Sequence, residues 1–201
     1  MQRISCMLAL AIMLTLSLAT SSYGKIYSSR VHGNWESFIL DSGEYGSIRI
    51  MTSSRQMDAS LVVDFYPNMC QTGYIKIIQS CPGCSDFSKT LTLHGESRVD
   101  RRAIQYTSYE VEMYDGFIFI SINAEDGHKL LKDFKEGQTV RFKMLVNGEP
   151  AYYRFSLVGF TAASNRAYNI CKYASTDDDA RYFEGMPDQP KSRQLPDAAY
   201  F

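Results

Sequence analysis

The sequence lacks the local motifs that identify most catalytic classes. It contains no HExxH, GxSxG, Walker or GxGxxG motif, and its three histidines (His32, His94 and His128) have no metal-ligand spacing. The net charge is only −1, from 21 basic and 22 acidic side chains, and there is no long basic run. A nucleic-acid-binding chain usually carries such a basic footprint. The sequence therefore predicts no catalytic residue, no cofactor, no metal site and no nucleic-acid partner, and leaves an unknown protein or envelope component as the partner.

Long hydrophobic runs are also missing, except near the N-terminus. Arg3 precedes an uncharged run of 12 residues from Met7 to Leu18, and small residues follow at Ala19, Ser21, Ser22 and Gly24. This is the pattern of a secretory signal peptide over residues 1–24. The alternative is an uncleaved anchor, but the run is short for a bilayer core that needs about 20 residues. We expect a periplasmic or secreted protein with no transmembrane span after the signal is removed.

Cysteine is scarce, and the expected mature chain contains an even number of cysteines. Removal of residues 1–24 takes away Cys6 and leaves Cys70, Cys81, Cys84 and Cys171. An even number of cysteines in an exported chain favours disulfides over metal ligation. If residues 74–80 form a strand, they span about 23 Å, too far for Cys70 to reach Cys81 or Cys84. This favours Cys81–Cys84 with Cys70–Cys171, while the other two pairings stay open.

The Cys81-Pro82-Gly83-Cys84 segment is the one motif in the sequence that could carry out a chemical reaction. Such a pair acts in thiol-disulfide exchange when one thiol lies at a helix N-terminus, which lowers its pKa. Here strands are predicted on both sides, and Pro82-Gly83 suits the centre of a type II turn. A structural disulfide is therefore the favoured interpretation, and redox exchange is the alternative.

The remaining chain is rich in β-branched and aromatic residues, broken by short turns. Strands are predicted over 47–51, 59–66, 74–80 and 89–95. Two hairpins are predicted, 106–114 with 117–123 and 140–146 with 151–158. Their turns, Asp115-Gly116 and Asn147-Gly148, suit type I′ geometry.

Two helices interrupt the strands. Asp126 can cap a short helix in which Leu130, Leu131 and Phe134 share a face, ending at Gly137. A second helix begins near Thr161, with a buried stripe formed by Ala163, Ala167, Ile170, Cys171 and Ala174. The predicted fold is mainly β: an antiparallel β-sandwich of two sheets with two short α-helices over residues 25–175. Residues 176–201, with Asp177–Asp179 and three prolines, are expected to be a flexible tail.

Exposed aromatic residues could supply a binding surface. Five tyrosines of the predicted hairpins are candidates: Tyr106, Tyr109, Tyr114, Tyr152 and Tyr153. Packing between strands is the alternative use of such residues. A small basic cluster between strands is formed by Arg98, Arg101 and Arg102, and it could hold an acidic group. The favoured interpretation is that these residues belong to a solvated loop.

The segment from 130 to 171 resembles a known family. A short helix ending in Gly137, a hairpin, and then Phe155-Ser-Leu-Val-Gly-Phe-Thr-Ala-Ala163 opening a helix are similar to the invasion-associated locus B family of exported bacterial proteins. Gly33-Asn34-Trp35 resembles that family's first strand. The family places a cysteine shortly after this tryptophan, where this chain has Ser37, so no disulfide pairing is carried over. The resemblance implies a small β-rich envelope or secreted protein, related to host interaction, and it supplies no catalytic residues to carry over. Together with the cysteine pattern, it predicts a non-enzymatic, disulfide-stabilised binding protein.

Overall fold

Ten strands and two helices make up the described part of the chain. The computed structural model describes residues 25–41, 46–54, 57–67, 69–70 and 73–174. The expected signal peptide (1–24) and tail (176–201) lie outside the described residues and stay predictions. The elements are β1 (Lys25–His32), β2 (Trp35–Asp41), β3 (Gly46–Ser54), β4 (Ala59–Phe65), β5 (Tyr74–Ser80), β6 (Phe87–Val99), β7 (Gln105–Tyr114), β8 (Phe117–Ala124), α2 (Gly127–Glu136), β9 (Thr139–Val146), β10 (Glu149–Ser156) and α3 (Phe160–Ala174).

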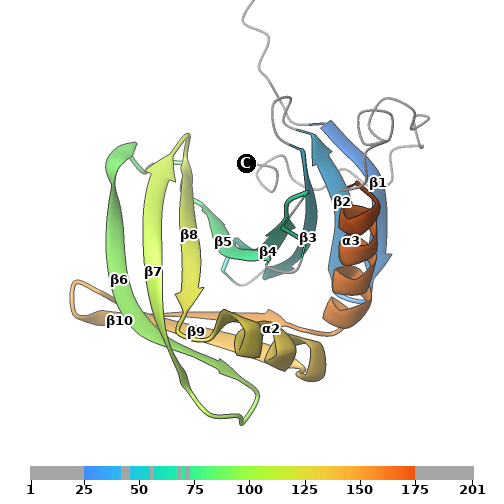
Figure 1. Cartoon of the computed structure of the whole chain (residues 1–201). Coiled ribbons are helices and arrows are strands. Elements are labelled where there is room, and N and C mark those ends of the chain that lie inside the picture. The colour runs from blue at the N-terminus through green and yellow to red at the C-terminus, as the bar shows by residue number, and fades with distance from the viewer. Residues whose placement is uncertain (1–24, 42–45, 55–56, 68, 71–72, 175–201) are drawn as a thin grey trace, which may run out of the picture.

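All ten strands belong to one antiparallel sheet, in the order β1-β2-β3-β4-β5-β8-β7-β6-β9-β10. The mainly antiparallel β class with two helices is thus confirmed, but the strands form one bent sheet where we expected two. The 13-residue strand β6 is the reason, because it pairs with both β7 and β9 and so joins the two halves. Figure 1 shows β9 and β10 crossing the lower side of the molecule, where β10 contacts β3.

Both predicted hairpin turns are confirmed. Asp115 and Gly116 have φ of 52° and 75°, and Asn147 and Gly148 have φ of 53° and 86°. A type I′ turn requires positive φ at both central residues, which asparagine, aspartate and glycine adopt at low cost. These turns fix the register of β7 with β8 and of β9 with β10.

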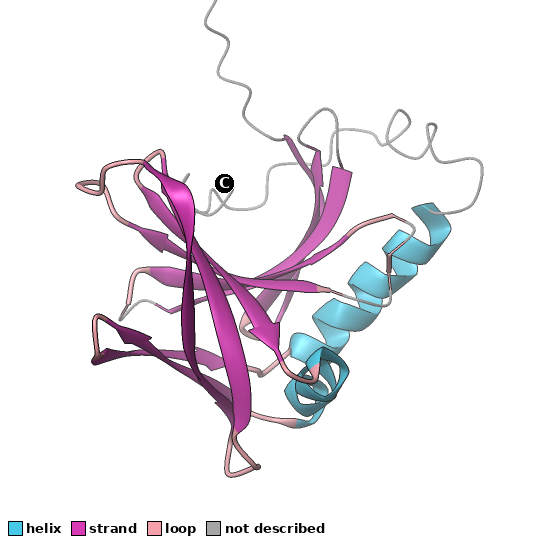
Figure 2. Ribbon diagram, turned by 60° about the vertical axis from the view of Figure 1, so that its left-hand side comes forward, coloured by secondary structure: helices cyan, strands magenta, loops and turns pink. Residues whose placement is uncertain are grey.

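Both predicted helices are confirmed as well. The Asp126 side chain accepts a hydrogen bond from the backbone N–H of Lys129 at 2.8 Å and so caps α2. The predicted apolar stripe of α3 faces the sheet, since Ala163, Ala167 and Cys171 are fully buried. Figure 2 shows the two helices on the same side of the molecule, and they contact each other there.

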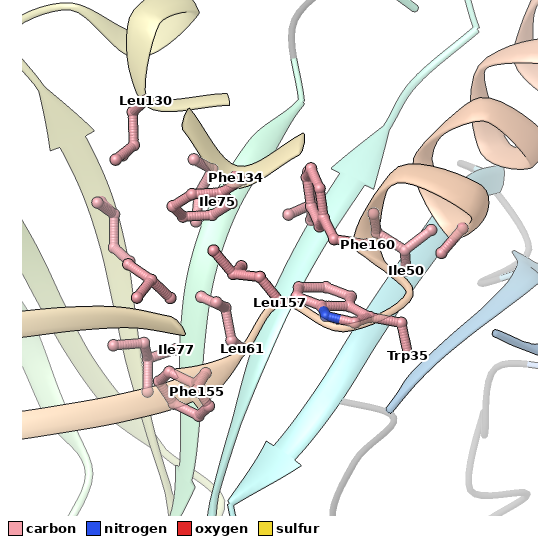
Figure 3. Packing of buried hydrophobic residues seen from close by; sticks show 14 of the residues in the cluster. Trp35, Ile50, Leu61, Ile75, Ile77, Leu130, Phe134, Phe155, Leu157 and Phe160 are labelled. Carbon is pink, nitrogen blue, oxygen red and sulfur yellow. The ribbon is translucent and has the colours of Figure 1, made fainter. Parts of the chain in front are cut away.

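The main core lies between the helices and one face of the sheet. In Figure 3, Phe134 of α2 and Phe160 of α3 point toward strand residues such as Ile75 and Ile50. The rings of Phe134 and Phe160 meet edge to face, with centroids 5.3 Å apart. Edge-to-face contact is a favoured arrangement for buried aromatic pairs. This core explains why the helices, marginal alone at 10 and 15 residues, are stable here.

A second, smaller cluster buries the opposite face of the central strands. It is formed by Phe38, Leu40, Met51, Val62 and Ile78. Next to it, Arg49 makes two hydrogen bonds to Asp64, at 2.7 and 2.9 Å, and Lys76 Nζ lies 3.5 Å from the same carboxylate. Every residue of β4 is therefore buried, which explains the nearly continuous apolar run of this strand.

The turn between β1 and β2 closes the fold against the end of β10. Asn34 N–H donates to the Val158 carbonyl at 3.0 Å, and the Trp35 indole N–H donates to the Ser156 carbonyl at 2.9 Å. Gly159 has φ of 97°, and a Cβ built there would lie 1.7 Å from the His32 carbonyl oxygen. Only glycine fits at position 159, because any side chain would push the two segments apart.

Substituting this glycine tests the closure. We expect Gly159→Ala to lower the free energy of unfolding by about 2–4 kcal/mol, because it combines a disfavoured backbone conformation with a backbone collision. Gly127→Ala is the matched control, since a Cβ at Gly127 meets nothing within 4 Å and helix position 127 favours alanine. Urea unfolding of both variants measures the difference, and equal stability would contradict the described closure.

Candidate functional site

The four cysteines form two disulfides in the favoured pairing. Cys70 is joined to Cys171 with a Cα–Cα distance of 5.6 Å, and Cys81 to Cys84 with one of 5.4 Å. Cys70 lies in the connection between β4 and β5, and Cys171 lies near the end of α3. The long-range disulfide therefore fastens the last helix to the sheet.

The Cys81–Cys84 disulfide spans a turn between two strands. Cys84 N–H donates to the Cys81 carbonyl at 2.9 Å, and Cys81 N–H donates to the Gly116 carbonyl at 2.7 Å. The prediction of a type II turn is wrong, because Gly83 does not have the positive φ that this type requires. Proline at the second turn position is equally compatible with type I, so the sequence could not separate the two. The next element is strand β6, not a helix.

Two of the five candidate tyrosines face the core side of the sheet. Tyr109 is fully buried, its hydroxyl donates to the Glu96 carbonyl at 2.9 Å, and burial raises its pKa. Tyr153 packs against the core, its hydroxyl donates to Gln79 Oε1, and burial raises its pKa too. The physical reason is that side chains alternate between the two faces of a strand. Tyr109 therefore lies on the other face of the sheet from Tyr106, and Tyr153 on the other face from Tyr152.

The other three tyrosines are exposed, but only two of them lie in one place. Tyr106 is 71% exposed and Tyr152 is 65% exposed. Tyr114 is half-exposed and stacks on Phe119, with ring centroids 4.9 Å apart. It lies at the other end of β7, about 26 Å from Tyr106 at the usual rise of a strand. The candidate surface therefore reduces to Tyr106 and Tyr152.

Strand register connects these two tyrosines. Tyr106 is opposite Glu96, Glu96 is opposite Lys143, and Lys143 is opposite Tyr152. The four side chains form one row on the outer face of the sheet, which we call the tyrosine row. Lys143 Nζ lies 3.9 Å from Glu96 Oε2. The row crosses three strand spacings, so the tyrosines are about 14 Å apart.

A row of arginines runs beside the tyrosine row. Arg98 is opposite Arg141, which is opposite Arg154, and all three are exposed. We call this set the arginine row. It lies on the same face, because each member is two residues along its strand from Glu96, Lys143 or Tyr152. Sequence reasoning noticed only Arg98, since the row exists through the pairing of β6, β9 and β10.

The sequence cluster of Arg98, Arg101 and Arg102 is divided by the fold. Arg102 donates to Asp133 at 2.6 Å and to Glu136 at 2.9 Å, and thereby ties the β6–β7 connection to α2. Burial alone would raise the pKa of Asp133, but the hydrogen bonds from Arg102 and Lys129 outweigh it and lower that pKa. Arg102 is thus neutralised within the fold, whereas Arg98 faces solvent beside Arg141.

Comparison with known proteins gives one match, and it is structural. No protein-family model matches the chain, and no curated protein matches it in sequence. The crystal structure of invasion associated protein B from Bartonella henselae superposes with a TM-score of 0.50 at 15% identity, covering 73% of this chain and 99% of that one. The chain shares the fold of that protein. The resemblance inferred from residues 33–35 and 130–171 is confirmed at this level.

The segments that carry the resemblance hold the fold together. Asn34 and Trp35 of the first segment bond to Ser156 and Val158 of the second. The rings of Trp35 and Phe160 also meet edge to face, 4.9 Å apart. These contacts join the two segments within this chain, and they identify no ligand.

Two kinds of feature are absent from the part of the chain that the structure describes. Within ranges 25–174, apart from the short gaps given above, no three His, Cys, Asp or Glu side chains gather as a metal site. In the same part of the chain, no helix has the length and apolar character needed to cross a membrane.

We expect the two disulfides to differ in their effect on stability. On the chain-entropy model, losing Cys70–Cys171, which joins residues 101 apart, costs about 4–5 kcal/mol, and losing the three-residue Cys81–Cys84 link costs about 2 kcal/mol. Urea unfolding of the Cys70→Ser/Cys171→Ser and Cys81→Ser/Cys84→Ser double variants measures both. A glutathione titration followed by mass spectrometry should leave both bonds intact. Selective reduction of Cys81–Cys84 would favour redox exchange instead.

The Asp133 ion pairs predict a pH dependence of stability. Because the pKa of Asp133 is lower in the folded chain, its contribution is complete above the unfolded value of about 3.9 and is lost as the pH falls through the folded value. Asp133→Asn should lower the free energy of unfolding by about 1–3 kcal/mol at pH 7, with a smaller difference below about pH 4. The exposed Glu149→Gln serves as control. A difference that does not shrink in acid would contradict this origin.

Proposed function

We propose that the chain is an exported, disulfide-stabilised binding protein of the bacterial envelope, periplasmic or secreted, that acts without catalysis. The observation that carries the proposal is the tyrosine row, which presents Tyr106 and Tyr152 at its two ends, on β7 and β10. The other candidate tyrosines either pack in the core or lie far along β7.

Export is supported by the disulfides and by the expected signal peptide. Disulfides form and persist in oxidising compartments. The Cys70–Cys171 bond is poorly suited to transient redox exchange, because Cys171 is buried. The solved structure with the same fold is described as an invasion associated protein. On that basis we extend the proposal to a contribution to host interaction.

A binding role is supported by the way the tyrosines are displayed. Tyrosine supplies a large, rigid contact area at a low entropy cost and is enriched where binding energy concentrates. The strands beneath Tyr106 and Tyr152 are held in register by a type I′ hairpin and by pairing on both sides of β6 and β9. A rigid support means that little conformational freedom is lost when a partner docks.

The alternative of thiol-disulfide exchange at Cys81 and Cys84 gains less support. The strand that follows Cys84 provides no helix dipole to stabilise a thiolate. The backbone N–H of Cys81 also donates to the Gly116 carbonyl, which ties this turn to the β7–β8 hairpin. We therefore assign the disulfide a structural role within the proposal.

The experiment compares partner capture by the oxidised exported protein and its variants. Tyr106→Ser/Tyr152→Ser should reduce capture of the principal partner from the envelope or host surface fraction by about 30-fold or more, as expected for contact residues of high energy. Tyr168→Ser on α3 is the matched control and should leave capture unchanged. Equal capture by the double variant and the wild type would contradict the assignment of this surface.

A further inference from the structure

The positive charges of the arginine row are not compensated within the described part of the fold. Like charges directly opposite each other on a sheet destabilise it, and here two such pairs share Arg141. Among the described residues, no acidic side chain forms an ion pair with Arg98, Arg141 or Arg154. A bound anion would convert this repulsion into attraction.

The acidic groups closest in the fold are already occupied. Glu96 pairs with Lys143 in the neighbouring row. The Asp100 carboxylate accepts hydrogen bonds from the backbone N–H groups of Gln138 and Thr139, both at 2.9 Å. Arg141 Nη1 reaches only the Asp100 carbonyl, at the long distance of 3.5 Å. The three guanidinium groups therefore keep most of their donors directed to solvent.

The shape of the cationic surface limits the kind of anion. Three neighbouring strands place the arginines along about 10 Å, with Lys143 beside them. Farther along the same face of β7 lie Glu110 and Glu112, both exposed. These carboxylates would repel an extended anionic plane such as a membrane surface. A narrow, linear polyanion that follows the arginines avoids them.

The accompanying residues favour a glycan among linear polyanions. Tyr106 and Tyr152 present ring faces on which the apolar faces of sugar rings can pack. Guanidinium groups are weakly hydrated and bind tetrahedral oxyanions with two parallel hydrogen bonds, which suits the weakly hydrated sulfate ester. Nucleic-acid binding draws its affinity from many more phosphate contacts, and the chain has a net charge of −1.

We propose that the arginine row and the tyrosine row together bind a short segment of a sulfated glycan. Arg98, Arg141 and Arg154 hold sulfate groups, and Tyr106 and Tyr152 pack against the sugar rings. This inference rests on the proposed function, since it names the class of partner for the same face of the sheet.

The test uses a heparin-derived octasaccharide as the probe and the full, oxidised exported protein. Isothermal titration should show binding that weakens as salt rises, because exposed charges are screened. The Arg98→Gln/Arg141→Gln/Arg154→Gln variant should lose at least 30-fold in affinity and most of the salt dependence. Arg30→Gln, on strand β1 at the other edge of the sheet, is the matched control and should stay within twofold of the wild type.

Two further variants keep the test informative. Arg141→Lys preserves the charge but removes the two-pronged donor, so an intermediate loss of affinity is expected. Tyr152→Ser should weaken octasaccharide binding several-fold without changing the salt dependence. Circular dichroism and urea unfolding check that each variant is folded, and the arginine variants should be at least as stable as the wild type because repulsion is removed.

Several outcomes would overturn the inference. These are unchanged affinity of the triple variant, equal binding of a desulfated octasaccharide, or tighter arginine-dependent binding of anionic lipid vesicles or single-stranded DNA. If the octasaccharide does not bind while Tyr106→Ser/Tyr152→Ser still abolishes partner capture, only the glycan assignment fails. If capture is also insensitive to the tyrosines, the proposed binding surface fails with it.

Discussion

The contact between the β1–β2 turn and the end of β10 is the constraint on which the remaining structure depends. A ten-stranded open sheet has two free edges, and bending alone does not hold them near each other. Asn34, Trp35 and Phe160 make this connection through hydrogen bonds and ring packing, and Gly159 allows the backbones to meet. With this corner fixed, α3 lies along β1 to β4, and Arg166 donates to the Ser28 and Ser37 carbonyls beneath it.

Local features of the fold could be predicted from the sequence, and long-range ones could not. The two type I′ hairpins, the cap at Asp126 and the apolar stripe of α3 each depend on residues that are close together in the sequence. The single sheet depends on β6 pairing with β9, which places Gly95 opposite Met144. At Gly95 an added Cβ would lie 2.0 Å from the Lys143 carbonyl oxygen. No local sequence pattern indicates such a close approach. The sequence therefore predicts two sheets where the structure has one.

The candidate site follows the same division. The exposure of Tyr106 and Tyr152 could be predicted from the sequence. The two-residue period of a strand could also have excluded Tyr109 and Tyr153 from the candidate binding surface. The pairing of Cys70 with Cys171 was favoured from the length of β5 alone. The arginine row, in contrast, combines residues 98, 141 and 154, and it exists only once three strands are in register.

The same corner has a consequence for the order of events during synthesis. The Trp35 indole bonds to a carbonyl 121 residues later in the chain, and the Cys70–Cys171 link spans a comparable separation. Proteins dominated by such distant contacts fold slowly, because loop closure precedes the gain in contacts. The N-terminal strands therefore lack their packing partners until the last third of the chain has emerged. Closure of the corner therefore has to wait until residues 156–160 have been synthesised.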